Sequence, residues 1–311
     1  MSSPLFTIDL GTPVSSAVDW LTEHLGGLFD AISSVMTTLV NAVLVVLTAP
    51  HPLVITVVFT VLAYFARKWG FAAFTVVAFL LIQAMGLWTE AMQSLAVVLV
   101  ASSLAVAIGV PIGVWAARGP LASAVVRPVL DFMQTLPVFV YLIPAVFFFG
   151  IGLVPGVVAT TVFAIPPAVR LTELGIRQVD REVVEAAHAF GAKPRQILRE
   201  VQLPLALPSI MAGVNQVIML ALSMVVIAGM VGAAGLGTVV VRGISQLDVG
   251  VGFQGGLAVV FLAIFLDRTT GALATTKRRK PRKNRTQSAP AVKVADTTSA
   301  PDPEPAVAAS A

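Results

Sequence analysis

The sequence predicts an all-α polytopic membrane protein, and three observations support this fold class. Hydrophobic residues make up 57% of the 311 residues and charged residues only 12%, whereas soluble domains carry about 25% charged residues. Seven apolar stretches reach or approach the length of about 20 residues that crosses a bilayer core. Basic residues between the stretches fall almost entirely on one side. We therefore expect about seven transmembrane helices.

The N-terminal segment, residues 1–50, is acidic and contains no Lys or Arg, as suits an extracytoplasmic segment. Within residues 28–47, polar side chains recur at helical spacing on one stripe; they are Asp30, Ser33, Ser34, Thr37, Thr38 and Asn41. This pattern predicts an amphipathic helix lying at the outer membrane surface. The alternative, an additional spanning helix, would have to bury the polar stripe against neighbouring helices.

The predicted spans follow in order along the chain. They are residues 50–66, 70–88, 91–117, 128–150, 153–171, 207–233 and 251–267. Eleven basic residues fall on one side of these spans, against Arg242 alone on the other; the eleven are Arg67, Lys68, Arg118, Arg127, Arg170, Arg177, Arg181, Lys193, Arg195, Arg199 and Arg268. Because the side rich in Lys and Arg is cytoplasmic, we expect the N-terminus outside and the C-terminus inside.

The C-terminal tail, residues 271–311, differs in composition from the rest. Seven of the nine residues 277–285 are basic, and the remainder is rich in Ala, Pro, Ser and Thr, a composition that does not bury enough apolar surface to fold. The basic cluster is typical of a stop-transfer signal before a solvated tail. As a second hypothesis, it contacts anionic membrane lipid and responds to cytoplasmic salt.

The residue types exclude several kinds of chemistry. The sequence has no phosphate-binding loop for ATP, no zinc-protease motif and no cysteine, and its three histidines lie far apart. We therefore expect no catalytic residues, no metal site, no cofactor and no nucleic-acid partner. Asp131 and Glu173 fall near predicted cytoplasmic ends rather than at midplane, so a proton relay is not indicated. Gly109 and Gly113 form a small-xxx-small pair that predicts close helix packing.

A polar loop, residues 180–204, interrupts the apolar pattern. Asp180 is a favourable N-cap, and apolar residues at helical spacing predict a short helix from 181 to 190. Gly191 is placed to take positive φ just past the end of that helix. Pro194 is suited to begin a second short helix, which we expect Pro204 to close. Two short helices joined by a glycine elbow would suit docking to another protein; the alternative is an amphipathic hairpin on the membrane surface.

The spacing within this loop resembles the EAA loop, by which permease subunits of ABC importers bind their ATPase subunits. The matching residues are Glu185, Ala186, Ala187, Gly191, Leu203 and Pro204, with Val201 where the family pattern usually has Ile. Residues 127–152, 155–179, 202–237 and 240–250 are similar to permeases of glycine betaine/proline ABC importers. The similarity covers about residues 85–270.

The resemblance implies a type I ABC importer permease fold in a bacterial inner membrane. Residues 51–88 would be two accessory transmembrane helices, and residues 89–270 a transmembrane domain with a five-helix core. Two permease copies would pair with two ATPase subunits and a separate extracytoplasmic substrate-binding protein. The implied cargo is glycine betaine or proline, with choline or carnitine as alternatives; no substrate-binding residue can be assigned. A secondary transporter is a further alternative, which the scarcity of midplane charges disfavours.

Overall fold

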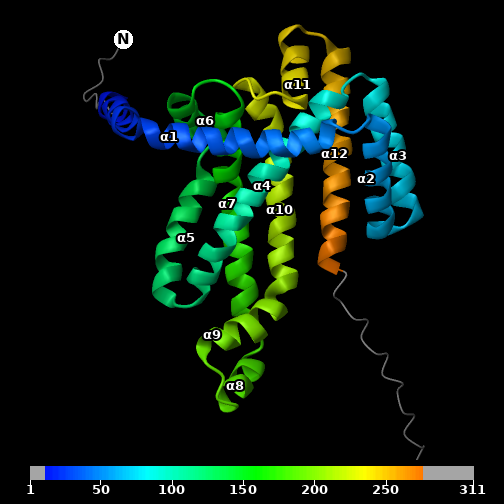
Figure 1. Cartoon of the computed structure of the whole chain (residues 1–311). Helices are drawn as coiled ribbons and strands as arrows, with labels where there is room; N and C mark the ends of the chain where they lie inside the picture. The colour runs from blue at the N-terminus through cyan, green and yellow to red at the C-terminus, as the bar shows by residue number, and fades with distance from the viewer. Residues whose placement is uncertain (1–10, 276–311) are drawn as a thin grey trace, which may run out of the picture. The chain divides into compact units, whose positions relative to one another are not determined.

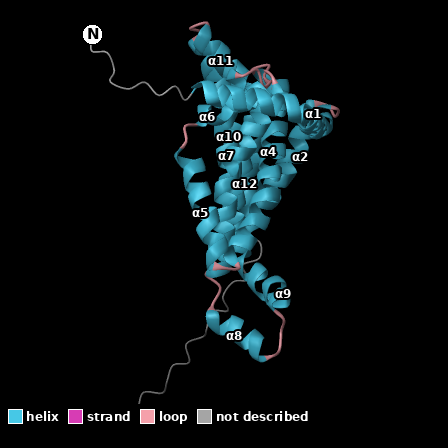
Figure 2. Cartoon of the chain, turned by 90° about the vertical axis from the view of Figure 1, so that its left-hand side faces the viewer, coloured by secondary structure: helices cyan, strands magenta, loops and turns pink. Residues whose placement is uncertain are grey.

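The computed structural model describes residues 11–275, and every regular element in that part is helical (Figures 1 and 2). The helices are α1 Gly11–Thr48, α2 Pro52–Arg67, α3 Trp69–Ala84, α4 Trp88–Ala117, α5 Pro120–Thr135, α6 Val138–Phe149, α7 Leu153–Arg177, α8 Arg181–Ala189, α9 Pro194–Gln196, the π-helix η1 Ile197–Gln202, α10 Leu203–Met230, α11 Leu236–Ser245 and α12 Val249–Thr275. The basic cluster 277–285 and its predicted lipid contact lie outside the described residues.

Three long helices, α4, α7 and α10, run side by side at the centre (Figure 1). Small residues allow this close approach. A Cβ atom on Gly109 would lie 2.6 Å from Cβ of Ala168, and one on Gly113 would lie 2.6 Å from the carbonyl oxygen of Val169. The close helix packing predicted for these two glycines is confirmed, and it brings α4 against α7.

The predicted span 128–150 is not one continuous helix. Helix α5 begins earlier, at Pro120, and α6 follows after a bend of 93°. The break has a local cause, because the residue before a proline is pushed out of the helical region and Leu136, before Pro137, has φ −69° and ψ 133°. The earlier start also places Arg127 inside α5, rather than in the loop that precedes it.

With this broken span, the five-helix core is α4, the α5–α6 pair, α7, α10 and α12, as predicted. By length and composition, five helices of the described part could cross a membrane, or six if the bent pair counts as one span. The remaining long apolar segment in that count, Val18–Thr48 within α1, takes a different direction.

Helix α1 runs across one end of the bundle rather than parallel to the core helices (Figure 1). It packs on α4 and α6 through its apolar side, where Val40 and Leu47 are buried. Phe29 stacks on Phe148 of α6, with ring centroids 4.6 Å apart. The polar stripe predicted for residues 28–47 is not buried: Asp30 and Asn41 are exposed. Val35, Val45 and Val46 of the same helix are exposed as well, at 53%, 61% and 68%, so the amphipathic surface helix stays a prediction.

Helices α2 and α3 form a hairpin beside α12. Each has 16 residues and is therefore about 24 Å long at 1.5 Å per residue, which is less than the about 30 Å of a bilayer core. Gln83 of α3 donates a hydrogen bond of 2.9 Å to Thr56 of α2. These two predicted spans are helical, but they are shorter than the core helices.

Polar groups join the core helices at a few positions. Asn215 of α10 donates to Asp267 of α12 at 2.9 Å and accepts from Thr270 at 2.7 Å. At the end of the bundle near α1, the backbone N–H of Leu236, which opens α11, donates to the Ser94 hydroxyl of α4 at 2.8 Å. Helix α11, which the apolar pattern did not predict, is thereby fixed to the core.

Candidate functional site

The loop 180–204 lies at the end of the bundle opposite α1 and α11 (Figures 1 and 2). Its first helix, α8, begins where the sequence predicts. The Asp180 side chain accepts a hydrogen bond of 3.0 Å from the backbone N–H of Glu182, which satisfies one of the free donors at the helix start. Glu182 adds negative charge to the first turn, where it complements the helix dipole.

The glycine elbow also has the predicted conformation. Gly191 has φ +78°, in the left-handed region that glycine tolerates. The N–H of Gly191 donates to the carbonyl of His188 at 2.9 Å, and the N–H of Ala192 donates to that of Ala187 at 3.1 Å. These two bonds together are a Schellman motif, which satisfies the last carbonyl groups of α8 and turns the chain back.

The second half of the loop differs from its prediction in one respect. Pro194 opens α9 as expected, and the backbone N–H of Lys193 donates to the Gln196 side chain at 2.9 Å. Pro204, however, does not close a short helix. The chain continues through the π-helix η1 directly into α10, so that Pro194–Met230 is one helical segment. The wider π turn before Pro204 accommodates a residue that lacks an N–H and would clash with the preceding turn of an α-helix.

The predicted docking residues of α8 lie mainly on the surface. Glu185 and Ala186 are exposed and Ala187 is half-buried. On the same apolar stripe, Val183 is 42% exposed and Phe190 is 93% exposed. In the described part of the chain this stripe has no covering element, so α8 presents a narrow apolar face to the solvent. Glu185 makes no ion pair within that part.

The second half of the loop is anchored to the bundle instead. Ile197 and Leu198 are buried, and Leu198 packs in a cluster with Ile176 of α7 and Ala206 of α10. The other predicted site residues, Val201 and Leu203, are half-buried, while Pro204 is exposed. The loop therefore has one fixed half and one projecting half, with Gly191 between them.

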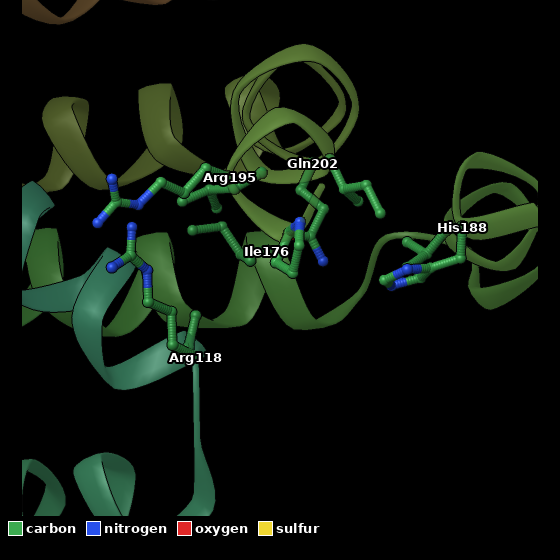
Figure 3. A pocket seen from close by; sticks show the side chains of 10 residues that line it. Arg118, Ile176, His188, Arg195 and Gln202 are labelled. Atoms are coloured by element: carbon green, nitrogen blue, oxygen red, sulfur yellow. The ribbon is translucent and has the colours of Figure 1, made fainter. Parts of the chain in front are cut away.

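A cleft of about 360 Å³ is lined by both halves of the loop and by the ends of α4 and α7. Arg118 and Arg195 both extend into one end of it, and His188 lies at the other end (Figure 3). None of the residues that line the cleft is acidic. Neither arginine has an ion-pair partner in the described part of the chain. The arrangement favours an anionic group from outside this chain.

A charged cluster lies near the C-terminal end of α7, close to this site, and the sequence did not predict it. Glu173 of α7 is only 4% exposed, and its carboxylate contacts Ser123 and Arg127 of α5 as well as Arg177 of α7. Glu173 and Arg177 are four residues apart, which is the spacing of a helical ion pair. That spacing was the available signal; the contacts from α5 depend on the tertiary packing.

A comparison with protein families identifies this architecture. Residues 109–279 match the family described as binding-protein-dependent transport system inner membrane component. The chain belongs to this family. It is therefore a permease of the inner-membrane type, and its several apolar helices make it a multi-pass membrane protein.

Individual relatives match the permease over most of its length. The glycine betaine transport system permease protein OpuAB of Bacillus subtilis is 47% identical over 88% of this chain and 97% of its own length. The glycine betaine/carnitine transport permease protein GbuB of Listeria monocytogenes is 50% identical over 86% of this chain and 95% of its own. The glycine betaine/proline betaine transport system permease protein ProW of Escherichia coli is 47% identical over 88% and 77%.

Among solved structures, the permease is similar to the MetNI methionine ABC transporter in inward-facing conformations. The TM-score is 0.55 at 24% identity, and the match covers 58% of this chain and 91% of the other. This likeness concerns the fold, and it confirms the predicted type I ABC importer permease fold.

Proposed function

We propose that this permease forms the membrane path of an ATP-driven importer for glycine betaine/proline-type osmoprotectants, and that it couples to a separate ATPase subunit through the loop 180–204. The observation that supports coupling best is the geometry of α8, a short helix projecting from the bundle with an uncovered apolar stripe. The cargo class rests on the names of relatives at 47–50% identity. Carnitine, named for one of them, and choline are alternative cargoes.

The shape of α8 suits insertion into a groove on the ATPase. Ala186 and Ala187 keep one face of the helix slim, and Val183 and Phe190 at either end supply apolar surface for burial. Burying apolar surface stabilises association by about 25 cal/mol per Å² before the costs of binding are subtracted. In helix-in-groove recognition, an amphipathic helix binds with its apolar face in a hydrophobic groove, and α8 has such a face.

The cleft behind α8 adds a charged contact to this docking surface. Because Arg118 and Arg195 extend into it and no acidic residue lines it, an acidic side chain of the ATPase would complement it. The projecting helix would then supply apolar contact, and the cleft would supply charge complementarity.

The proposed assembly contains two permease copies, two ATPase subunits and a separate extracytoplasmic binding protein. We place α8 on the cytoplasmic side, because most of the basic residues outside the tail lie at that end by the charge rule. Helix α1 would then lie at the outer membrane surface, α2 and α3 would be accessory membrane helices, and residues 271–311 would be a cytoplasmic tail. Selection of a quaternary ammonium cargo by an aromatic cage would fall to the binding protein.

The docking role is tested with a matched pair of variants at Ala186. Ala186→Trp adds bulk to the slim face of α8, whereas Ala186→Ser keeps it small. We expect Ala186→Trp to reach the membrane in normal amount. A loss of 1.4 kcal/mol in the free energy of ATPase binding lowers the affinity tenfold, and we expect less than about a tenth of the ATPase to be recovered on co-purification. Ala186→Ser should retain the ATPase. Equal retention in both variants would show that α8 is not the docking element.

A further inference from the structure

Glu173 is the one fully buried charged residue in the described part of the chain. It lies on α7, one turn before that helix ends at Arg177. After Arg177, residues 178–180 form a short joint and α8 begins at Arg181. The buried carboxylate therefore lies at the base of the projecting helix, not in the middle of the bundle.

Three side chains contact the same oxygen, Oε1, of Glu173. The hydroxyl of Ser123 donates at 2.7 Å, a guanidinium nitrogen of Arg127 lies at 3.1 Å, and Nε of Arg177 lies at 3.0 Å. Arg177 also donates to the carbonyl oxygen of Ala116, in the last turn of α4, at 3.1 Å. One carboxylate thus joins α5 and α7 directly and reaches the end of α4 through Arg177.

The contacts from α5 exceed what neutralising the carboxylate requires. Glu173 and Arg177 are both on α7 and form an ion pair within that helix, which already balances the buried charge. Ser123 and Arg127 come from a different helix, and Arg127 is itself 60% exposed, so burial does not force it to pair. Their geometric effect is to fix α5 to the end of α7.

Helix α5 is the first of the two helices in the bent α5–α6 pair. One side of α5 is not covered by any other element in the described part of the chain. Leu121, Val125 and Phe132 are 82%, 63% and 64% exposed. Its other contacts with α7 are apolar, through Val126 and Leu130, apart from a surface ion pair between Asp131 and Arg170. Apolar contacts are non-directional, whereas charge-assisted hydrogen bonds fix distance and angle. The Glu173 carboxylate is therefore the buried directional link between α5 and the base of α8.

We propose that Glu173 is a positioning residue that makes α5 move together with α8 when the ATPase displaces the loop. The proposal rests on the proposed docking function of α8. Without the link from α5, a displacement that α8 passes to the end of α7 would be lost by sliding of α5 on α7. ATP hydrolysis would then continue without moving the broken span.

The test removes the α5 side of the link and leaves the ion pair on α7 in place. The variant S123A/R127Q would be assembled with the ATPase subunit in proteoliposomes and supplied with betaine-loaded binding protein. We expect normal co-purification of the ATPase and unchanged basal ATP hydrolysis. Uptake per ATP hydrolysed should fall about 5-fold or more, the lower range of coupling between two sites in one protein.

Two further variants separate this role from a general effect on folding. Asp131 of α5 pairs with Arg170 of α7, but Asp131 is 66% exposed, so D131N should couple as the wild type does. R127K keeps a cation on α5 and should restore most of the coupling. If S123A/R127Q does not reach the membrane, R127Q alone carries the same test, because that side chain is largely exposed.

Wild-type uptake per ATP in S123A/R127Q, or in R127Q alone, would overturn the proposal, as would an equal loss in D131N. Failure of the wild-type chain to bind any ATPase would instead contradict the docking function, and the two failures are therefore distinguishable.

Discussion

The glycine elbow of the loop allows a quantitative prediction. Gly191 has φ +78°, and a Cβ atom added there would have no heavy atom within 4 Å. A substitution therefore introduces backbone strain without a steric clash. A non-glycine residue in the left-handed region costs about 1–2 kcal/mol, and a β-branched residue falls toward the upper part of a range of about 1–3 kcal/mol.

A cost of about 2 kcal/mol lowers the population of the native elbow about 30-fold relative to competing conformations, since 1.4 kcal/mol is tenfold. In Gly191→Val, the backbone at residue 191 would then leave the left-handed conformation and the Schellman motif would open. As a result, α8 would present its apolar stripe at a different angle. Gly191→Asn should have a smaller effect, because Asn tolerates the left-handed region. Neither change should alter membrane insertion, since α8 and α9, which flank Gly191, lie beyond the end of the helical bundle (Figure 1).

The assay measures three quantities for the wild type and both variants: permease in the membrane, ATPase recovered with it, and betaine uptake. We expect equal amounts of permease, with ATPase recovery and uptake falling in the order wild type, Gly191→Asn, Gly191→Val. Full recovery and uptake in Gly191→Val would refute the reasoning that the elbow conformation positions α8.

Three other predictions follow from the account. Reporter fusions at residues 25 and 290 should report opposite sides of the membrane, with residue 25 outside, and finding both on one side would contradict an odd number of spans. The purified chain should not hydrolyse ATP alone, because it has no phosphate-binding loop; activity that persists through stringent purification would contradict a separate ATPase. Gly113→Ala should lower thermal stability by about 1–3 kcal/mol, since its Cβ would lie 2.6 Å from the Val169 carbonyl, whereas Gly70→Ala, with nothing within 4 Å, should not destabilise; equal melting temperatures would refute the close packing.

Local rules predicted most of the loop up to Pro194 well. The capping preference of Asp180, the positive φ of Gly191 and the start of a helix at Pro194 depend on a few neighbouring residues, and all three are confirmed. Pro204 was misjudged because a proline was expected to end a helix. A π turn can accommodate Pro204 only where tertiary packing holds the residues before it. Here the buried side chains of Ile197 and Leu198 fix η1 to the bundle.

Hydrophobic pattern alone could not locate the break in the second core element. Residues 128–150 read as one apolar span, yet the conformation of Leu136 divides it and places the preceding helix against α7. The Glu173 cluster could not be predicted for a related reason. Its partners Ser123 and Arg127 lie about 50 residues away in sequence and meet the carboxylate only once α5 and α7 are packed together.

The central claim is that this permease transports its cargo through ATP hydrolysis by a partner. The direct measurement is uptake of labelled glycine betaine into proteoliposomes containing the permease and the ATPase, with the binding protein added outside. The account predicts uptake that requires enclosed ATP, the ATPase and the binding protein together, and that is unaffected when ion gradients are collapsed. Uptake by the permease alone, driven by a sodium or proton gradient without ATP, would contradict it.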